Sequence, residues 1–305
     1  MADELTARME RLMGPLPGAD RRVPLDVEIV DEVDRGDYLR RLISYSAEPG
    51  GRTPAYLLLP KTALGGGRPA PGVLALHPTE HTIGHRVVVE PLGAANRDYA
   101  RRLAEAGFVV LAPAYPLMAG HEPDLPALGY VSGTMKAIWD NVRGLDLLDQ
   151  LPEVAAGGYG AMGHSLGGHN AIFTAVFEPR IRAVVSSCGF DSFADYMGGD
   201  LAGWRQDRYL PLLAPGALPP FDFDELLAAL APREVLISAP LGDTNFGWRS
   251  AARMADRARP AFAAAGAADR LTVLHPDCGH DLPDPVLERA IAFLAEAIGA
   301  ASPRL

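Results

Sequence analysis

The chain has 305 residues, of which 48% are hydrophobic, 22% are charged and two are cysteines, and its net charge is -10. This length and composition fit a globular protein with a sizeable core and exclude a disulfide scaffold, so we expect Cys188 and Cys278 to be reduced thiols. The negative charge argues against a nucleic acid or an anionic membrane as partner.

The N-terminus is predicted to be a short amphipathic helix rather than a targeting segment. Apolar residues recur on one side of residues 1–13, but this segment lacks the apolar core of a signal peptide. No run of about 18 apolar residues, the length of a membrane span, occurs anywhere in the chain. We therefore expect a cytoplasmic protein.

An antiparallel meander is predicted to follow this helix. From residue 23 the apolar residues alternate with polar ones, which is typical of half-buried strands. Turn signals rich in glycine, proline and aspartate then separate three such strands. We place them at residues 23–29, 39–46 and 55–59.

From residue 72 the pattern changes to short apolar runs that alternate with helical segments. Continuous apolar runs are typical of strands buried on both faces, and strand–helix–strand units form right-handed crossovers in a parallel sheet. We therefore predict an α/β fold with residues 1–305 as one domain and residues 1–20 as an N-terminal helix or arm. The expected strands are 72–76, 108–112, 159–162, 183–188, 234–239 and 271–274, and the expected helices are 96–106, 134–151, 168–177, 250–265 and 284–299.

One stretch, residues 190–223, breaks this alternation, and we call it the 190–223 insertion. It is long, has no clear period and carries several aromatic residues and prolines. Such a stretch predicts an excursion over the sheet edge that serves as a lid or as a wall of the substrate pocket. Within it, Arg205 and Arg208 could meet a substrate carboxylate or could pair with neighbouring aspartates.

A nucleophile motif lies between one of the predicted strands and the helix after it. The sequence Gly163-His164-Ser165-Leu166-Gly167 matches the G-x-S-x-G pattern of a nucleophile elbow. In such an elbow a sharp turn strains the serine backbone, and the two glycines remove Cβ atoms that would collide with neighbouring elements. The alternative is an ordinary glycine-rich loop between strand and helix.

Partners for a serine nucleophile occur in the chain order that the elbow requires, which is serine, acid and then histidine. Asp243 and His280 each follow a predicted strand, so both should lie with Ser165 at the carboxyl edge of the sheet. We assign nucleophilic attack to Ser165, proton transfer to His280, and orientation of the imidazole to Asp243. A rival for the acid is Asp191, which follows the preceding strand.

An oxyanion hole needs two N–H donors beside the serine. The residue after the nucleophile, Leu166, should supply one, and the loop after strand 72–76 should supply the other. Proline has no N–H, so Pro78 cannot donate, and we expect Thr79 to be the second donor ahead of Glu80.

A zinc motif is the main alternative use of this loop. Residues 77–81 match the H-x-x-E-H pattern of inverted zinc peptidases, with His85 nearby. That motif works on a helix, whereas here it directly follows a buried strand. We therefore predict no metal and no cofactor, and interpret the loop as part of the oxyanion hole and pocket. Of the other histidines, we expect His164 to pack under the elbow and His169 to lie on the helix at the edge of the site.

The candidate lining of the substrate pocket is largely aromatic, which favours an apolar or ring-bearing group on the substrate. The residues are His77, Glu80, Tyr115, Met118, Tyr196, Trp204, Phe246 and Trp248.

These motifs together resemble the α/β-hydrolase superfamily over residues 20–300. More narrowly, the meander that ends at Pro60, the Gly163–Gly168 segment, Ala239–Asp243 and Cys278–His280 are similar to the branch of dienelactone-hydrolase-like and acetylxylan-esterase-like proteins. The resemblance implies an eight-stranded, mostly parallel sheet with the meander at one edge. Dienelactone hydrolases use a cysteine where this chain has Ser165, so their lactone substrate does not carry over.

The leading function is a serine hydrolase that cleaves a small-molecule carboxylic ester or thioester through an acyl-serine. An acyltransferase or cyclase in a biosynthetic pathway would use the same intermediate with another acceptor. A binding protein that keeps the fold without activity is a third possibility, and the complete serine, aspartate and histidine set argues against it.

Overall fold

The computed structural model describes residues 2–204 and 209–299. Their strands form one nine-stranded sheet in the order β1-β2-β3-β5-β4-β6-β7-β8-β9. Neighbouring strands from β1 to β5 run antiparallel, and the pairs from β5 to β9 are parallel. The predicted α/β sheet with a meander at one edge is confirmed, with one strand more than the resemblance implied. The strands are β1 Glu28–Asp34, β2 Tyr38–Glu48, β3 Gly51–Pro60, β4 Gly72–Leu76, β5 Val109–Pro113, β6 Tyr159–His164, β7 Ile181–Ser187, β8 Glu234–Ser238 and β9 Leu271–Leu274.

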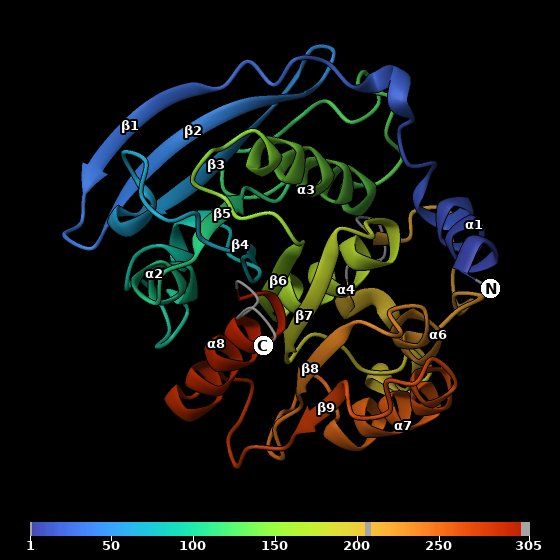
Figure 1. The fold of residues 1–305 in the computed structure, drawn as a ribbon. Coiled ribbons are helices and arrows are strands. Elements are labelled where there is room, and N and C mark those ends of the chain that lie inside the picture. Colours follow the sequence, from blue (N-terminus) through green and yellow to red (C-terminus); the bar gives the residue numbers. More distant parts are fainter. Residues whose placement is uncertain (1, 205–208, 300–305) are drawn as a thin grey trace.

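Helices cover both faces of the sheet and enclose two apolar cores (Figure 1). One face carries α1, α3, α4, α6 and α7, and the other carries α2 and α8. No helix among residues 2–204 and 209–299 is long and apolar enough to cross a lipid bilayer. The helices are α1 Ala2–Met13, α2 Tyr99–Glu105, α3 Gly133–Asp149, α4 Leu166–Phe177, α6 Phe223–Ala228, α7 Trp248–Ala264 and α8 Asp284–Ile298.

The first strand lies later in the chain than the apolar alternation predicted. β1 spans Glu28–Asp34 instead of residues 23–29, and Ile29 and Val30 are 56% and 64% exposed. Only β2 pairs with this edge strand. Alternation implies burial only where a second layer covers the apolar face, and that layer is missing at the edge.

The register of the parallel strands brings their carboxyl ends into one row. Leu76 at the end of β4 is paired with Gly163 of β6, and His164 is paired with Ser187 of β7. Ser187 is paired with Ser238, which ends β8, and Ser238 is paired with the last residue of β9. The loops after β4, β6, β7, β8 and β9 therefore leave the sheet side by side, although they are far apart in sequence.

Helix α3 lies against the meander with polar as well as apolar residues buried. Lys136, Asp140 and Arg143, spaced at i, i+4 and i+7 on one stripe, are at most 4% exposed. Lys136 Nζ forms ion pairs with Glu48 at 3.1 Å and with Asp140, and the Thr53 hydroxyl donates to Asp140 Oδ1 at 2.6 Å. The sequence predicted a helix at residues 134–151 but not its buried charges.

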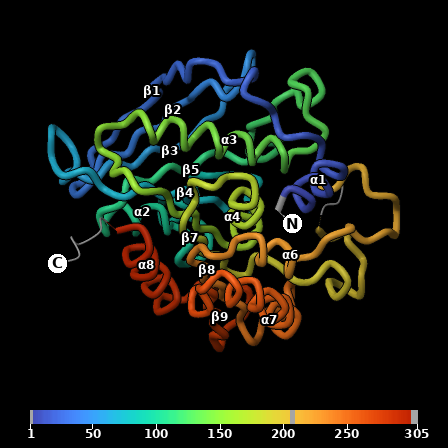
Figure 2. Tube along the Cα trace, turned by 45° about the vertical axis from the view of Figure 1, so that its right-hand side comes forward, coloured from blue at the N-terminus to red at the C-terminus, as the bar shows by residue number. Residues whose placement is uncertain are grey.

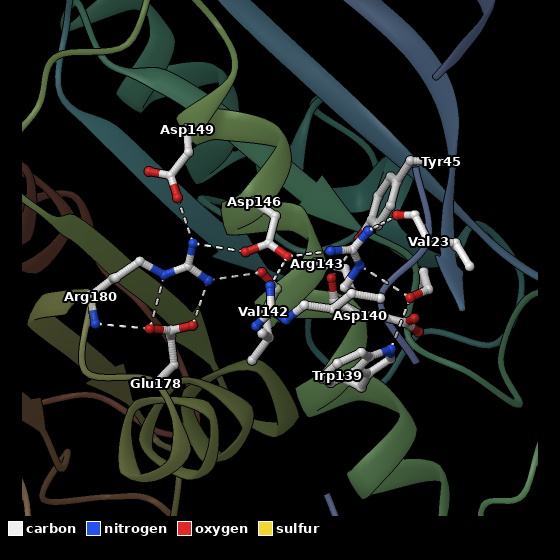
Figure 3. Close-up of polar contacts among 12 residues, drawn as sticks. Val23, Tyr45, Trp139, Asp140, Val142, Arg143, Asp146, Asp149, Glu178 and Arg180 are labelled. Carbon is white, nitrogen blue, oxygen red and sulfur yellow. Dashed lines mark hydrogen bonds and ion pairs between the residues drawn. The ribbon is translucent and has the colours of Figure 1, made fainter. Parts of the chain in front are cut away.

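The same helix is tied to the turn between α4 and β7 by arginine–carboxylate contacts (Figure 3). Asp146 accepts from Arg143 and also pairs with Arg180, whose NH1 lies 2.9 Å from Asp146 Oδ1. Arg180 further donates to Glu178 at 2.6 Å and to Asp149 at 2.5 Å. We call Lys136, Asp140, Arg143, Asp146 and their partners the α3 network.

The 190–223 insertion packs against the N-terminal helix (Figure 2). Arg8 of α1 donates to the carbonyl of Pro220 at 2.5 Å and pairs with Glu225 of α6. Tyr196, Trp204 and other aromatic residues of the insertion are buried in the core on this face. Arg205 and Arg208, the candidate carboxylate ligands, lie outside the described residues.

Candidate active site

The elbow between β6 and α4 has the geometry that the motif predicts. Ser165 adopts φ 55° and ψ -121°, a left-handed backbone that a residue with a side chain rarely occupies. A Cβ on Gly163 would stand 2.1 Å from the carbonyl carbon of Gly167, and one on Gly167 would stand 1.8 Å from the oxygen of Leu76. Only glycine fits at these two positions, so the turn can hold the serine above the sheet edge.

The loops after β8 and β9 bring the predicted acid and base together. Nδ1 of His280 lies 2.9 Å from Oδ2 of Asp243. The other oxygen of Asp243 accepts the N–H groups of Asn245 at 2.8 Å and of Phe246 at 3.0 Å. Burial raises the pKa of Asp243, but the His280 contact and the two N–H groups outweigh it and hold that pKa below its usual value. The acid is therefore ionised and can orient the imidazole.

Backbone contacts fix the two loops to one another. The N–H of Gly242 donates to the carbonyl of Cys278 at 2.9 Å, and the N–H of Leu241 donates to the carbonyl of Pro276 at 3.0 Å. A Cβ on Gly242 would stand 2.9 Å from that Cys278 oxygen. The glycine therefore permits a close approach that sets the distance between acid and base.

Asp191, the rival acid, has a different role. Its carboxylate accepts the N–H of Ser192 at 2.7 Å and the N–H of Gly247 at 2.9 Å, at the start of α7. Burial raises the pKa of Asp191. Among the described residues, Asp191 forms no hydrogen bond with His280. The geometry therefore favours Asp243 as the acid.

Ser165 and His280 face a common cavity of about 190 Å³, which Glu80 and Arg97 also line. No hydrogen bond joins the two side chains among the described residues, and such bonds are often long until substrate binds. Arg97 fixes the backbone that carries His280, because it donates to the His280 carbonyl at 3.3 Å and to Asp281 Oδ1 at 2.8 Å. His164, the buried neighbour of the nucleophile, packs its ring 5.0 Å from that of His280.

Two backbone N–H groups are available as oxyanion donors. Leu166 is the first residue of α4, so its N–H has no acceptor within the helix. Thr79 lines the cavity of about 190 Å³ that Ser165 and His280 face, and it also lines a cavity of about 120 Å³ on another side of Ser165. The N–H of Glu80, the less favoured candidate, donates instead to Met118 Sδ at 3.2 Å. The arrangement favours Leu166 and Thr79.

Comparison with known proteins agrees with this fold. A glucuronoyl esterase from Solibacter usitatus superposes with a TM-score of 0.74 at 20% identity, over 98% of this chain and 92% of its own. Acetyl Xylan Esterase 1 from Thermoanaerobacterium sp. JW/SL YS485 gives a TM-score of 0.63 at 19% identity, over 97% of this chain and 93% of its own.

The chain has the α/β-hydrolase fold. YtaP of Bacillus subtilis (strain 168), which is named as a hydrolase, is 25% identical over 306 aligned positions that cover 96% of this chain and 99% of YtaP. The sequence matches no protein-family profile. The acetyl xylan esterase agrees with the branch that the motifs resembled, and the glucuronoyl esterase was not anticipated.

A second cavity, of about 120 Å³, opens beside Ser165. Three of the predicted pocket residues, Tyr196, Trp204 and Phe246, line it together with Ser165. Glu80 lines the neighbouring cavity that holds His280.

Four predicted pocket residues lie elsewhere. Tyr115 is buried with its hydroxyl 3.0 Å from Thr134 Oγ1, and Trp248 packs its ring 5.0 Å from that of His275. His77 and Met118 line a separate cavity with His85 and His121. Proximity in sequence to a strand end does not decide on which side of a loop a side chain points. His77 follows β4, and Tyr115 and Met118 follow β5, yet in the described part of the chain none of these three lines a cavity with Ser165.

The zinc motif is not assembled. Both ring nitrogens of His77 have backbone partners, the carbonyl of Pro78 at 2.8 Å and the N–H of Tyr115 at 2.9 Å. Glu80 accepts the N–H of Thr82 at 2.8 Å, and His81 is exposed. This loop is therefore held by its own backbone contacts.

Within the described residues, one group of metal-ligating side chains gathers at the site. Ligand atoms of Cys188, Asp243 and His280 lie within 4.8 Å of one another. Burial raises the pKa of Cys188, and the neighbouring Asp243 carboxylate raises it further, so the thiol stays protonated. Its S–H donates to the carbonyl of Asp281 at 3.4 Å. Cys188 therefore packs beneath the acid–base pair as a neutral group.

Sequence analysis placed His169 only at the edge of the site, and it did not name as pocket residues four others that line the cavity beside Ser165, which are Gly189, Gly203, Tyr209 and Asn245. His169 lines the same cavity. His169 follows Ser165 by four residues, one turn along α4, and this spacing places it on the same side of the helix as the nucleophile. That i+4 position was a signal in the sequence.

Proposed function

We propose that this protein is a serine hydrolase that cleaves carboxylic esters through an acyl-serine intermediate. The observation that carries the proposal is the His280–Asp243 contact at the same sheet edge as a strained Ser165, with Ser165 and His280 facing one cavity. Two of the structural neighbours are esterases by name, which supports an ester as the substrate.

In the proposed reaction, Ser165 Oγ attacks the carbonyl carbon while His280 takes its proton. The negative charge on the former carbonyl oxygen is stabilised by the N–H groups of Leu166 and Thr79. His280 then gives the proton to the leaving alcohol, and the acyl group stays on Ser165. A water molecule, activated by the same imidazole, releases the acid and restores the serine.

Water is the acceptor that the site favours. The His280 side chain is 28% exposed, so solvent reaches the base that must activate it. An acyltransferase or cyclase would shield this imidazole after acylation. The insertion supports a fixed substrate wall rather than a lid, because its aromatic residues Tyr196 and Trp204 are buried in the core.

The test is the Ser165→Ala variant with p-nitrophenyl acetate and a fluorophosphonate probe. We expect wild-type protein to hydrolyse the ester and to be labelled at Ser165, and the variant to lose turnover by roughly 10⁶-fold with no labelling. The melting temperature should stay close to that of wild type. Undiminished turnover in the variant would refute the proposal, and transfer of the acyl group to an added alcohol or amine in place of water would replace it with the transferase reading.

A further inference from the structure

His169 is a buried polar residue that the catalytic roles above leave unused. It lies in the first turn of α4, where its N–H donates to the Ser165 carbonyl at 3.0 Å, and only 2% of the residue is exposed. Its side chain lines the cavity of about 120 Å³ that Ser165 opens into. A polar side chain therefore stands at the wall of the substrate cavity one helical turn from the nucleophile.

Among residues 2–204 and 209–299, no group forms a hydrogen bond with either ring nitrogen of His169. Burial lowers its pKa to about 3, so the imidazole is neutral near pH 7. A neutral imidazole offers one N–H donor and one nitrogen acceptor. Buried polar groups are nearly always paired, so an unpaired donor and acceptor in a residue that lines a cavity indicate that a ligand completes them.

Aromatic rings hold this imidazole in one orientation. Phe173 stacks on it with ring centroids 4.0 Å apart, and the centroids of Tyr209 and Phe223 lie 4.9 and 5.6 Å away. Trp204, which lines the same cavity, lies at 5.7 Å. A fixed polar edge surrounded by apolar faces can select between groups of equal shape by whether they carry an oxygen.

We propose that His169 is the polar anchor of the substrate pocket and hydrogen-bonds an oxygen atom on the part of the ester that enters the 120 Å³ cavity. The preferred substrate then carries a hydroxyl or ether oxygen on a compact group near the ester bond. This inference rests on the proposed ester hydrolase function. The pocket is then not purely apolar, and it distinguishes substrates that differ in a single oxygen atom.

The test uses substrate pairs that differ only in one ring atom, because the cavity could accept either the acyl or the alcohol part. The acyl pair is p-nitrophenyl tetrahydropyran-4-carboxylate and p-nitrophenyl cyclohexanecarboxylate. The alcohol pair is tetrahydropyran-4-yl acetate and cyclohexyl acetate. In one of the two pairs we expect wild-type kcat/KM to be about ten- to a hundredfold higher for the substrate with the oxygen-containing ring. The carbocyclic substrate of that pair leaves the imidazole N–H of His169 without an acceptor.

The His169→Phe variant keeps the stacked ring and removes both nitrogens. We expect it to bring this ratio close to one, mainly because kcat/KM for the ether substrate falls. His85→Phe is the matched control, because His85 is also buried with an unpartnered Nε2 but lines the separate cavity of His121. That control should keep the wild-type ratio.

A binding measurement separates failure of this inference from failure of the hydrolase. Methyl tetrahydropyran-4-carboxylate and methyl cyclohexanecarboxylate, which differ only in the ring oxygen, are titrated into Ser165→Ala protein, and the imidazole ¹⁵N shifts of His169 are followed. Tighter binding of the ether with a shift at His169 supports the anchor even if wild-type protein hydrolyses no ester. Equal binding, or a wild-type preference that persists in His169→Phe, overturns it while the hydrolase stands.

Discussion

The α3 network and the cavity beside Ser165 both contain buried polar residues, but they differ in how far these residues are paired. In the network the cations Lys136 and Arg180 pair with carboxylates, although Oδ2 of Asp140 has no hydrogen-bond partner among the described residues. In the network, Arg180 alone contacts the side chains of Asp146, Asp149 and Glu178 (Figure 3). At the site, His169 has no partner on either ring nitrogen, and Nε2 of His164 also has none. Both regions contain polar residues that are at most 5% exposed.

The comparison concerns where buried polar groups without a hydrogen-bond partner are tolerated in this protein. A buried polar group without a partner costs about 1–3 kcal/mol, and in the network the ion pairs of Lys136 with Glu48 and Asp140 reduce this cost. A substrate cavity tolerates that cost because the ligand supplies the partner. Breaking a pair in the network should therefore reduce stability, whereas changing the site should reduce activity or alter selectivity.

The largest expected effect is on the acid of the site. Asp243→Asn keeps the shape but removes the charge that orients His280, so we expect kcat to fall by roughly 10⁴-fold with p-nitrophenyl acetate. Asp191→Asn is the matched control, and its kcat should fall far less because Asp191 binds backbone N–H groups instead. Equal losses in the two variants would mean that the acid has been misassigned.

A sizeable effect on stability is expected in the network. Lys136→Met leaves Glu48 and Asp140 buried without their cation, and removal of one partner from such a group costs about 3–5 kcal/mol. Urea unfolding measures this loss, while kcat/KM of the folded protein should stay near the wild-type value. The control is Lys61→Met, whose ion pair with Asp34 is exposed and should contribute little.

The next effect concerns activity, and it follows from the assignment of Thr79 as an oxyanion donor. Thr79→Pro removes the proposed donor and should lower kcat by about 10²–10³-fold, with KM changed much less. Glu80→Pro removes an N–H that Met118 already accepts, so it should act mainly on the melting temperature. A larger loss of kcat in Glu80→Pro than in Thr79→Pro would move the donor to residue 80.

The smallest effect is on the pH dependence of stability. Burial holds the pKa of His169 at about 3, below its ordinary value, so the unfolded chain binds a proton that the folded protein excludes. Stability therefore falls as pH decreases from about 6.5, by up to about 1.4 kcal/mol per pH unit for this one group. His169→Phe should reduce that slope between about pH 5.5 and 4 in urea titrations. An unchanged slope would show that the imidazole is protonated or paired in the folded protein.

The sequence by itself determined the order of strands and helices, apart from the short helix α6, and the local chemistry of the elbow. Gly163, Ser165 and Gly167 are recognisable because a tight turn imposes its residue types over a few positions. Asp243 and His280 could be placed because parallel strands all end at one edge, so a residue just after a strand has a known location. Both inferences depend only on residues in or next to one element of the chain.

Only the tertiary structure decided which side chains face the cavity and how buried charges are paired. Trp204 and Phe246 line the cavity with Ser165, whereas Tyr115 and His77, equally plausible by sequence, turn away. Side-chain direction in a loop depends on packing against elements that are distant in the chain. The same reason hid the buried charges of α3 and the exposed edge of β1, because burial is set by the layer that lies opposite and not by the residue itself.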